Sequence, residues 1–142
     1  MPQTTQNFNN HKRIVPGFHF LTYGLIIALL IAGIVLLTSC GYLLIGSLTL
    51  LIAVTFAMTA IYTRSFAIKA QDRGIRVEEN LRHFMLTGKP LSSGLRLGQI
   101  IALRFASDEE FVALAIRAEK ENLKGKEIKQ AIKNWRGDYH RV

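Results

Sequence analysis

Two long apolar runs dominate the first half of the chain. They cover residues 18–38 and 42–62, and no Asp, Glu, Lys or Arg occurs between Ile14 and Thr63. Each run has about 21 residues, which as an α-helix extend roughly 31 Å, the thickness of a bilayer's hydrocarbon core. The pattern therefore predicts two transmembrane helices.

The two runs are separated only by Ser39, Cys40 and Gly41. So short a link allows nothing more than a turn, which makes residues 18–62 an antiparallel transmembrane hairpin. One continuous helix is the geometric alternative. Ser39, Gly41 and the doubled length disfavour it.

Small residues indicate how the two helices pack, because helices in lipid gain mainly from close approach of their backbones. The positions expected to pack are Gly24, Ala28 and Ala32 on the first helix and Ala53 and Ala57 on the second. Packing within the hairpin is the expectation. Association between chains through the same ridges is the alternative.

The helical pattern continues past the second run, over residues 63–87. Acid-before-base pairs at i,i+4, Asp72–Arg76 and Glu78–Arg82, favour a helix. A thin heptad-like stripe runs along it: Ala67, Ala70, Gly74, Val77, Leu81 and Phe84. We predict a stalk that ends at Thr87-Gly88, with Ala70 and Gly74 as helix-packing positions. A coiled-coil dimer and a stalk covered by the rest of the chain both remain open.

A linker over residues 88–94 leads to a tail, residues 95–142, that predicts three short helices. The first covers Leu95 to Phe105, with Leu97, Ile100, Ile101 and Phe105 on one side. The second follows a capping box of Ser107 and Glu110 and carries Phe111, Leu114, Ala115 and Ala118. The last covers about Lys126 to Asp138, with Ile128, Ala131, Ile132 and Trp135 on its apolar face. The fold class is thus an all-α membrane protein with a small helical tail.

Charge gives the hairpin an orientation. Basic residues flank it on both sides, in an N-terminal arm of residues 1–17 and after Tyr62, and the connecting turn carries none. The positive-inside rule therefore places both termini in the cytoplasm. The net charge of +8 also favours contact with anionic lipid. The residues expected to touch lipid or a partner are Lys12, Arg13, His19, Arg64, Lys69, Arg73, Arg104, Lys129, Lys133, Trp135 and Arg136.

The single cysteine, Cys40, raises a competing interpretation. Leu37-Thr38-Ser39-Cys40 matches a bacterial lipoprotein signal, in which the cysteine is lipidated after cleavage. A second full span follows Cys40 where a polar linker is expected, and cleavage would put the basic tail on the wrong side. The hairpin is therefore preferred.

Candidate chemistry is sparse. The four histidines form no ligand pair, and His19 at the membrane edge suits interface anchoring better than haem ligation. The acidic run Asp108-Glu109-Glu110 suits helix capping better than cation binding. The basic segment with Lys124, Lys126, Lys129, Lys133 and Arg136 also carries Glu119, Glu121 and Glu127. This mixture of charges disfavours nucleic acid. We expect no catalytic residue, no cofactor and no metal.

Four segments resemble a family of small two-span bacterial membrane proteins known as a domain of unknown function. They are Asn10–Arg13 continuing through Val15–Phe20, Tyr62–Arg73, Leu103–Glu110, and Ile132–Arg136 ending in Asp138-Tyr139. The resemblance implies a bacterial origin and the same hairpin topology. It implies no activity.

Three functions fit these features. The first is a non-enzymatic accessory or scaffold protein that docks another membrane protein, or a second copy, at the cytoplasmic surface of the inner membrane. The second is a membrane-tethered regulator whose basic last helix binds anionic lipid or nucleic acid. The third is a subunit of an enzyme or redox complex, which would require His19 or Asp108 to act with groups from another chain.

Overall fold

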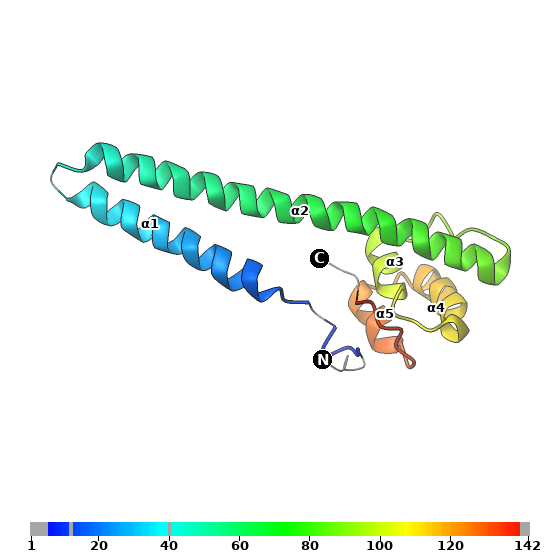
Figure 1. The fold of residues 1–142 in the computed structure, drawn as a ribbon. Helices are drawn as coiled ribbons and strands as arrows, with labels where there is room; N and C mark the ends of the chain where they lie inside the picture. The colour runs from blue at the N-terminus through cyan, green and yellow to red at the C-terminus, as the bar shows by residue number, and fades with distance from the viewer. Residues whose placement is uncertain (1–5, 12, 40, 140–142) are drawn as a thin grey trace. The chain divides into compact units, whose positions relative to one another are not determined.

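The computed structural model describes residues 6–11, 13–39 and 41–139, and within these ranges the chain is all-helical, as predicted. The helices in order are η1 (Gly17–Thr22), α1 (Tyr23–Thr38), α2 (Leu43–Thr87), α3 (Leu97–Leu103), α4 (Asp108–Lys120) and α5 (Gly125–Ala131) (Figure 1). Contacts divide the chain into two compact units. We call residues 14–68 the apolar unit, and residues 1–13 with 69–142 the polar unit. The polar unit thus joins the N-terminal arm, the predicted stalk from Lys69, the linker and the tail.

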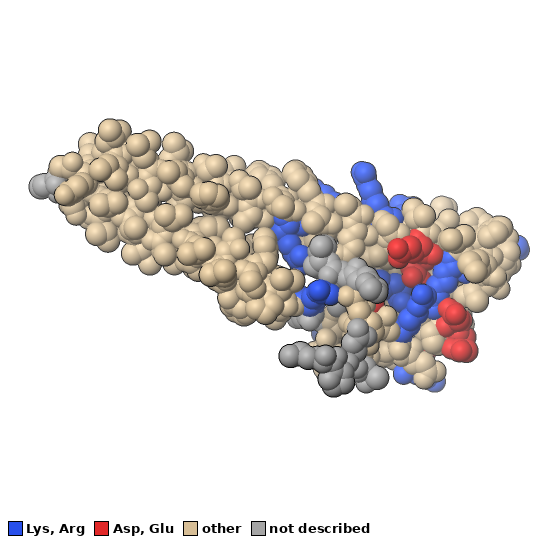
Figure 2. All heavy atoms as spheres, viewed as in Figure 1, with Lys and Arg blue, Asp and Glu red and all other residues tan. Residues whose placement is uncertain are grey.

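Two helices are long and apolar enough to cross a membrane, Gly17–Thr38 and Leu43–Thr87. Their apolar parts appear in Figure 2 as an uninterrupted tan surface. Hydroxyl groups on this surface are satisfied locally, because Thr49, Thr55 and Thr59 each donate to the carbonyl oxygen four residues earlier. An apolar solvent provides no other partner for such groups, so this arrangement suits lipid.

The contact between α1 and α2 uses two glycines. A Cβ atom at Gly46 would lie 2.6 Å from the backbone nitrogen of Leu37, and one at Gly33 would lie 2.7 Å from the side chain of Leu50. The turn between the helices also needs a glycine, because Gly41 has φ +87°. Neither Gly33 nor Gly46 stands out in a search for small residues at four-residue spacing.

The predicted small-residue ridges are therefore corrected in part. On α2, Ala53 is fully buried and Ala57 half-buried, as expected for packing positions. On α1, Gly24, Ala28 and Ala32 are exposed. The buried positions of α1 are instead Ile26 and Gly33, one heptad apart, because Gly33 makes room for a leucine of α2.

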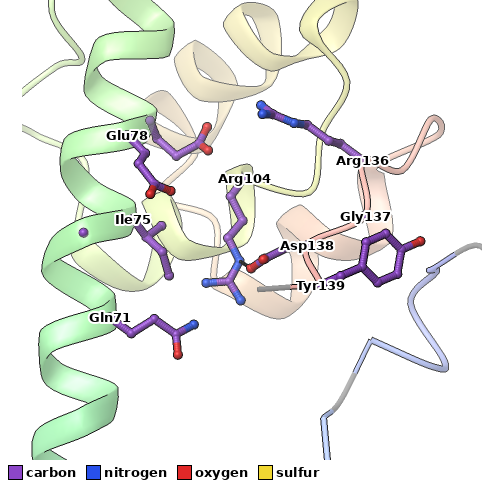
Figure 3. A pocket seen from close by; sticks show the side chains of 10 residues that line it. Gln71, Ile75, Glu78, Arg104, Arg136, Gly137, Asp138 and Tyr139 are labelled. Carbon is purple, nitrogen blue, oxygen red and sulfur yellow. Dashed lines mark ion pairs between the residues drawn. The ribbon is translucent and has the colours of Figure 1, made fainter. Parts of the chain in front are cut away.

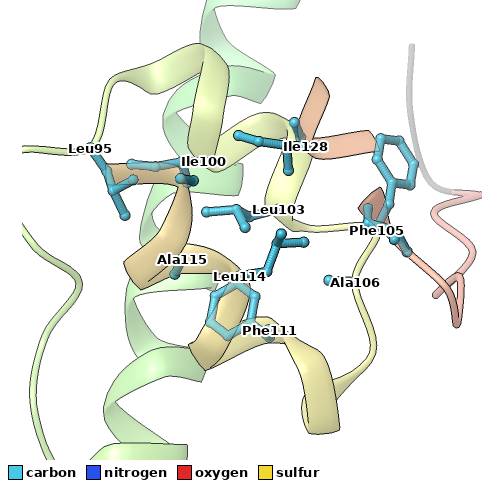
Figure 4. Packing of buried hydrophobic residues seen from close by; sticks show 12 residues of the cluster. Leu95, Ile100, Leu103, Phe105, Ala106, Phe111, Leu114, Ala115 and Ile128 are labelled. Carbon is cyan, nitrogen blue, oxygen red and sulfur yellow. The ribbon is translucent and has the colours of Figure 1, made fainter. Parts of the chain in front are cut away.

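The polar unit has a hydrophobic core of its own, formed by α3, α4 and α5 (Figure 4). Its largest fully buried side chains are Phe105, Phe111, Leu103 and Ile128. The face predicted for the second tail helix is confirmed, since Phe111, Leu114, Ala115 and Ala118 of α4 are all buried.

The first and last tail helices are shorter than predicted. Leu97 opens α3 and is exposed, and α5 ends at Ala131 instead of continuing to Asp138. The chain beyond Ile132 is extended because its backbone pairs with residues 105–107. Arg136 N–H donates to Phe105 O at 2.8 Å, and Ser107 N–H donates to the carbonyl of Asn134 at 3.1 Å.

The capping box at Ser107 does not form as predicted. Ser107 is the N-cap of α4, but its hydroxyl makes no capping hydrogen bond. The Glu110 carboxylate instead accepts from the backbone N–H groups of Lys133 (3.2 Å) and Asn134 (2.8 Å). Glu110 thus fastens the returning C-terminal segment to the start of α4.

One side of α2 in the polar unit is covered by α3–α5 (Figure 1). Ile75, Glu79 and Arg82, at i, i+4 and i+7, are the buried residues of this side. Val77, Leu81 and Phe84 of the heptad-like stripe are exposed, so the described residues do not cover this part of it. Gly88, with φ +72°, follows the end of α2 at Thr87.

Gly46 and Gly24 offer a matched test of the helix contact. We expect Gly46→Ala to destabilise the apolar unit by about 1–3 kcal/mol, because the added methyl group meets backbone atoms of Leu36 and Leu37. Gly24→Ala is the control, because a Cβ there has nothing within 4 Å. Both variants make the same gain in helix propensity. Unfolding in mixed micelles, followed by circular dichroism, measures the difference, and equal stability of the two variants would contradict this contact.

Candidate functional site

Arg82 connects α2 to the tail through every part of its guanidinium group. Its Nε donates to Asp108 Oδ1 at 2.7 Å, Nη1 to Glu79 Oε2 at 3.0 Å, and Nη2 to the carbonyl of Ala106 at 2.7 Å. The guanidinium carbon also lies 4.3 Å from the centre of the Phe111 ring. The side chain is buried, so these partners replace the water that would otherwise solvate its charge.

Glu79 is the buried partner in this network. Burial raises the pKa of Glu79 above its ordinary value, and the hydrogen bond and positive charge of Arg82 oppose that rise. The more distant positive charge of Arg136 acts in the same direction as Arg82. Desolvation is the larger effect, so the folded protein favours the protonated carboxyl more than the unfolded chain does.

Beside this network lies a polar cleft of about 490 Å³ (Figure 3). Its lining residues are Gln71, Gly74, Ile75, Glu78, Glu79, Arg104, Arg136, Gly137, Asp138 and Tyr139. Within it the buried Arg104 pairs with Asp138, with 3.0 Å between Nε and Oδ2. A second hollow of about 510 Å³ shares Glu78, Glu79 and Arg136 with it. Arg136 therefore stands between two depressions of the surface.

The N-terminal arm holds the C-terminal wall of the polar cleft in place. The Gln6 side chain binds the backbone of Asp138 twice, donating to its carbonyl at 3.0 Å and accepting from its N–H at 2.9 Å. Arg13 donates to the carbonyl of Tyr139 at 2.7 Å. The two ends of the chain thus build one site.

His11 extends this contact to the core. Its ring lies 5.8 Å from the rings of both Phe105 and Trp135. Its Nδ1 lies 2.7 Å from the carbonyl of Phe8, and its Nε2 lies 3.1 Å from Lys129 Nζ. A neutral ring with the proton on Nδ1 satisfies both contacts, because the ammonium group can only donate.

The structure brings together only some of the residues predicted as contacts. Arg13, Arg104 and Arg136 meet at the polar cleft, while Lys129 and Trp135 pack against Phe105 beside it. The others do not line the cleft. In the apolar unit, His19 hydrogen-bonds the backbone of Val15 and Arg64 lies 5.9 Å from the Phe18 ring. In the polar unit, Lys69, Arg73 and Lys133 are exposed. Lys12 lies outside the described residues, as does Cys40.

Neither Gln6 nor Glu79 stands out in the sequence, and Arg82 stands out only as the i,i+4 partner of Glu78. The structure instead pairs Arg82 with Glu79 and Asp108. The spacing of Ile75, Glu79 and Arg82 marks one helical face, and that signal could have identified the network. Nothing in the sequence marks Gln6, whose partner lies 132 residues away.

Ion pairs engage the carboxylates around the polar cleft. The carboxylates of Glu79, Asp108 and Asp138 are held by arginines in the described part of the chain. The described residues contain no group of three His, Cys, Asp or Glu side chains able to hold a metal ion. Arg136 takes part in no ion pair among the described residues, which leaves its charge at the edge of the cleft for a ligand.

Replacing Arg82 should lower the stability of the polar unit. We expect Arg82→Met to cost about 3–5 kcal/mol, because Glu79 would remain buried without its partner. Adding Glu79→Leu to that variant should restore much of the loss, since no buried charge then remains unpaired. Arg76→Met, on the exposed side of α2, is the control. Urea unfolding followed by the fluorescence of Trp135, the single tryptophan, measures each variant; an additive double variant would contradict the pairing.

Glu79 should also give stability a pH dependence of defined sign. Because the pKa of Glu79 is raised in the folded protein, the contribution of this residue to the free energy of unfolding is largest at low pH. It falls as the pH rises from the ordinary glutamate range through the raised pKa. Glu79→Gln lacks this titration. We therefore expect the Tm of the wild type, minus that of Glu79→Gln, to decrease as the pH rises above the ordinary glutamate range. A difference that stays constant, or rises with pH, would show that burial does not dominate.

Comparison with known proteins places the chain in a family. No curated protein and no solved structure matches it. A family model described as a family of unknown function, DUF6526, matches residues 1–142, which include both apolar helices and every residue of the polar cleft. Three of the four segments that carry the family resemblance line this cleft, through Gln71, through Arg104, and through Arg136, Asp138 and Tyr139. The fourth contacts its wall, because Arg13 donates to the carbonyl of Tyr139. The chain therefore belongs to the family of unknown function DUF6526.

Proposed function

We propose that this protein is a non-enzymatic accessory subunit of the bacterial inner membrane, which docks another membrane protein at the cytoplasmic surface through the polar cleft. The observation that carries the proposal is Arg136, an exposed charge between two depressions of a surface held in place by buried ion pairs. A prearranged surface of this kind loses little conformational entropy on binding.

The proposed topology is a hairpin that crosses the bilayer twice, with both termini in the cytoplasm. Two apolar helices of sufficient length support it, and so does the satisfaction of their threonine hydroxyls by backbone carbonyls. Basic residues before the first span and after the second favour this orientation over the reverse. The contact between Arg13 and Tyr139 agrees with it, because the two ends of the chain must then lie on the same side of the membrane.

The alternatives receive less support from the described residues. The last helix offers less basic surface to lipid or nucleic acid than expected, because α5 is short and Lys129 packs against His11 and Phe105. For a shared enzyme site, Asp108 is engaged by Arg82 and His19 by the backbone of Val15. A docking surface needs neither group to be released.

Purification of the tagged full chain from native membranes in mild detergent tests the proposal. We expect a stoichiometric membrane protein to accompany the wild type and to be retained about tenfold less by Arg136→Glu, since a charge reversal at an interface edge commonly costs about 1.4 kcal/mol. Lys126→Glu is the matched control: an exposed residue in the first turn of α5, where a helix tolerates a carboxylate.

Trp135 fluorescence verifies that both variants are folded. Equal retention of the partner by both would overturn the role of the polar cleft. Recovery of the wild type alone, with lipid or nucleic acid released by salt, would overturn the accessory function and favour the tethered regulator.

A further inference from the structure

The outer face of α2 in the polar unit carries large apolar side chains with no covering element among the described residues. Val77 is 69% exposed, Leu81 57%, Phe84 52% and Met85 77%. A helix that belongs to a folded, charged unit does not usually leave so many apolar groups in water. The covered residues Ile75, Glu79 and Arg82 lie on another side of the same helix. Leu81 and Met85 border that side, because they line one hollow together with Arg82.

The spacing of this face matches a two-stranded coiled coil. Gly74, Val77, Leu81 and Phe84 follow one another at steps of three, four and three residues, which are the a, d, a and d positions of a heptad. A Cβ atom at Gly74 would have nothing within 4 Å, so this face is open where a partner helix would approach most closely.

The charges beside the face decide what covers it. In this register Arg73 occupies a g position and Glu78 the following e position. In a parallel dimer each g residue faces the e residue five positions later on the other helix. Arg73 of each copy would then face Glu78 of the other, so that two opposite-charge pairs form at once. Both side chains are exposed.

We infer that this face binds the same face of a second copy of the chain, as a short parallel coiled coil over residues 70–85. The inferred interface adjoins the polar cleft, because Gly74 and Glu78 also line that cleft, whereas Val77 and Phe84 do not. The inference rests on the proposed membrane anchorage. Copies inserted in the same orientation present α2 in parallel. Two heptads would be too short to associate in dilute solution, but confinement to a bilayer raises the effective concentration of one helix for the other.

Disulfide crosslinking of the full chain in vesicles of phosphatidylethanolamine and phosphatidylglycerol tests the dimer. With Cys40→Ser as background, Val77→Cys places a thiol at a d position and Arg76→Cys places one on the exposed flank of the same helix. We expect Val77→Cys to give about tenfold more dimer than Arg76→Cys, and the yield to persist as the lipid-to-protein ratio is raised. Equal yields, or a yield that falls to the control level on dilution, would overturn the inference.

Charge reversal tests the register independently. Arg73→Glu and Glu78→Arg should each weaken dimerisation about tenfold, because two attractive pairs become repulsive. An equimolar mixture of the two variants should restore it, because each g–e pair between unlike copies is again of opposite charge. Energy transfer between labelled copies in the same vesicles measures both. A mixture as weak as either variant alone would overturn the parallel register.

The outcomes separate this inference from the proposed function. A monomer at every lipid dilution, with partner retention still dependent on Arg136, would overturn the dimer and leave the accessory function supported. A dimer restored by mixing, with no Arg136-dependent partner, would support the inference and overturn the accessory function.

Discussion

The polar unit depends on the buried guanidinium group of Arg82. From α2 it reaches the tail by hydrogen bonds to both a carboxylate and a backbone carbonyl, those of Asp108 and Ala106. Once it is buried, its charge must be matched, and Glu79 and Asp108 fulfil this requirement from two directions. Because breaking such a network leaves a charge without water or partner, the tail has one favourable position on α2.

That position has consequences for the rest of the surface. With Ile75 and Glu79 committed to the tail, another side of α2 remains exposed, together with its apolar stripe. The same docking creates the polar cleft, whose other wall is the C-terminal segment. Gln6 and Arg13 hold that wall by backbone hydrogen bonds. Both surfaces that we assign to partners therefore result from the packing of the tail on one side of α2.

The apolar and polar units are stabilised by different physical means. In the apolar unit, glycines at two positions let the two helices approach closely, and threonine hydroxyl groups bond to carbonyl groups of their own helix. In the polar unit, Phe105, Phe111 and Ile128 are fully removed from water and supply a conventional core. A single long helix, α2, contributes to both units, so its sequence changes from apolar all round to one buried face.

The sequence by itself determined what depends on local periodicity. The apolar runs, the end of α2 at Thr87 and the buried face of α4 could all be predicted, because each repeats with the period of a helix or is marked by glycine. Of the polar cleft, the sequence indicated Arg13, Arg104 and Arg136, but only as members of a longer set of basic residues. Tertiary structure decided the rest. It ends α5 at Ala131 and brings the returning C-terminal segment to Glu110. It also pairs Arg82 with Glu79 and Asp108, not with Glu78, and bonds Gln6 to Asp138. These contacts join groups that are far apart in the chain, or select one of several equivalent local partners. Which partner is selected depends on burial and on which backbone groups would otherwise be unpaired. Neither condition produces a periodic pattern in the sequence.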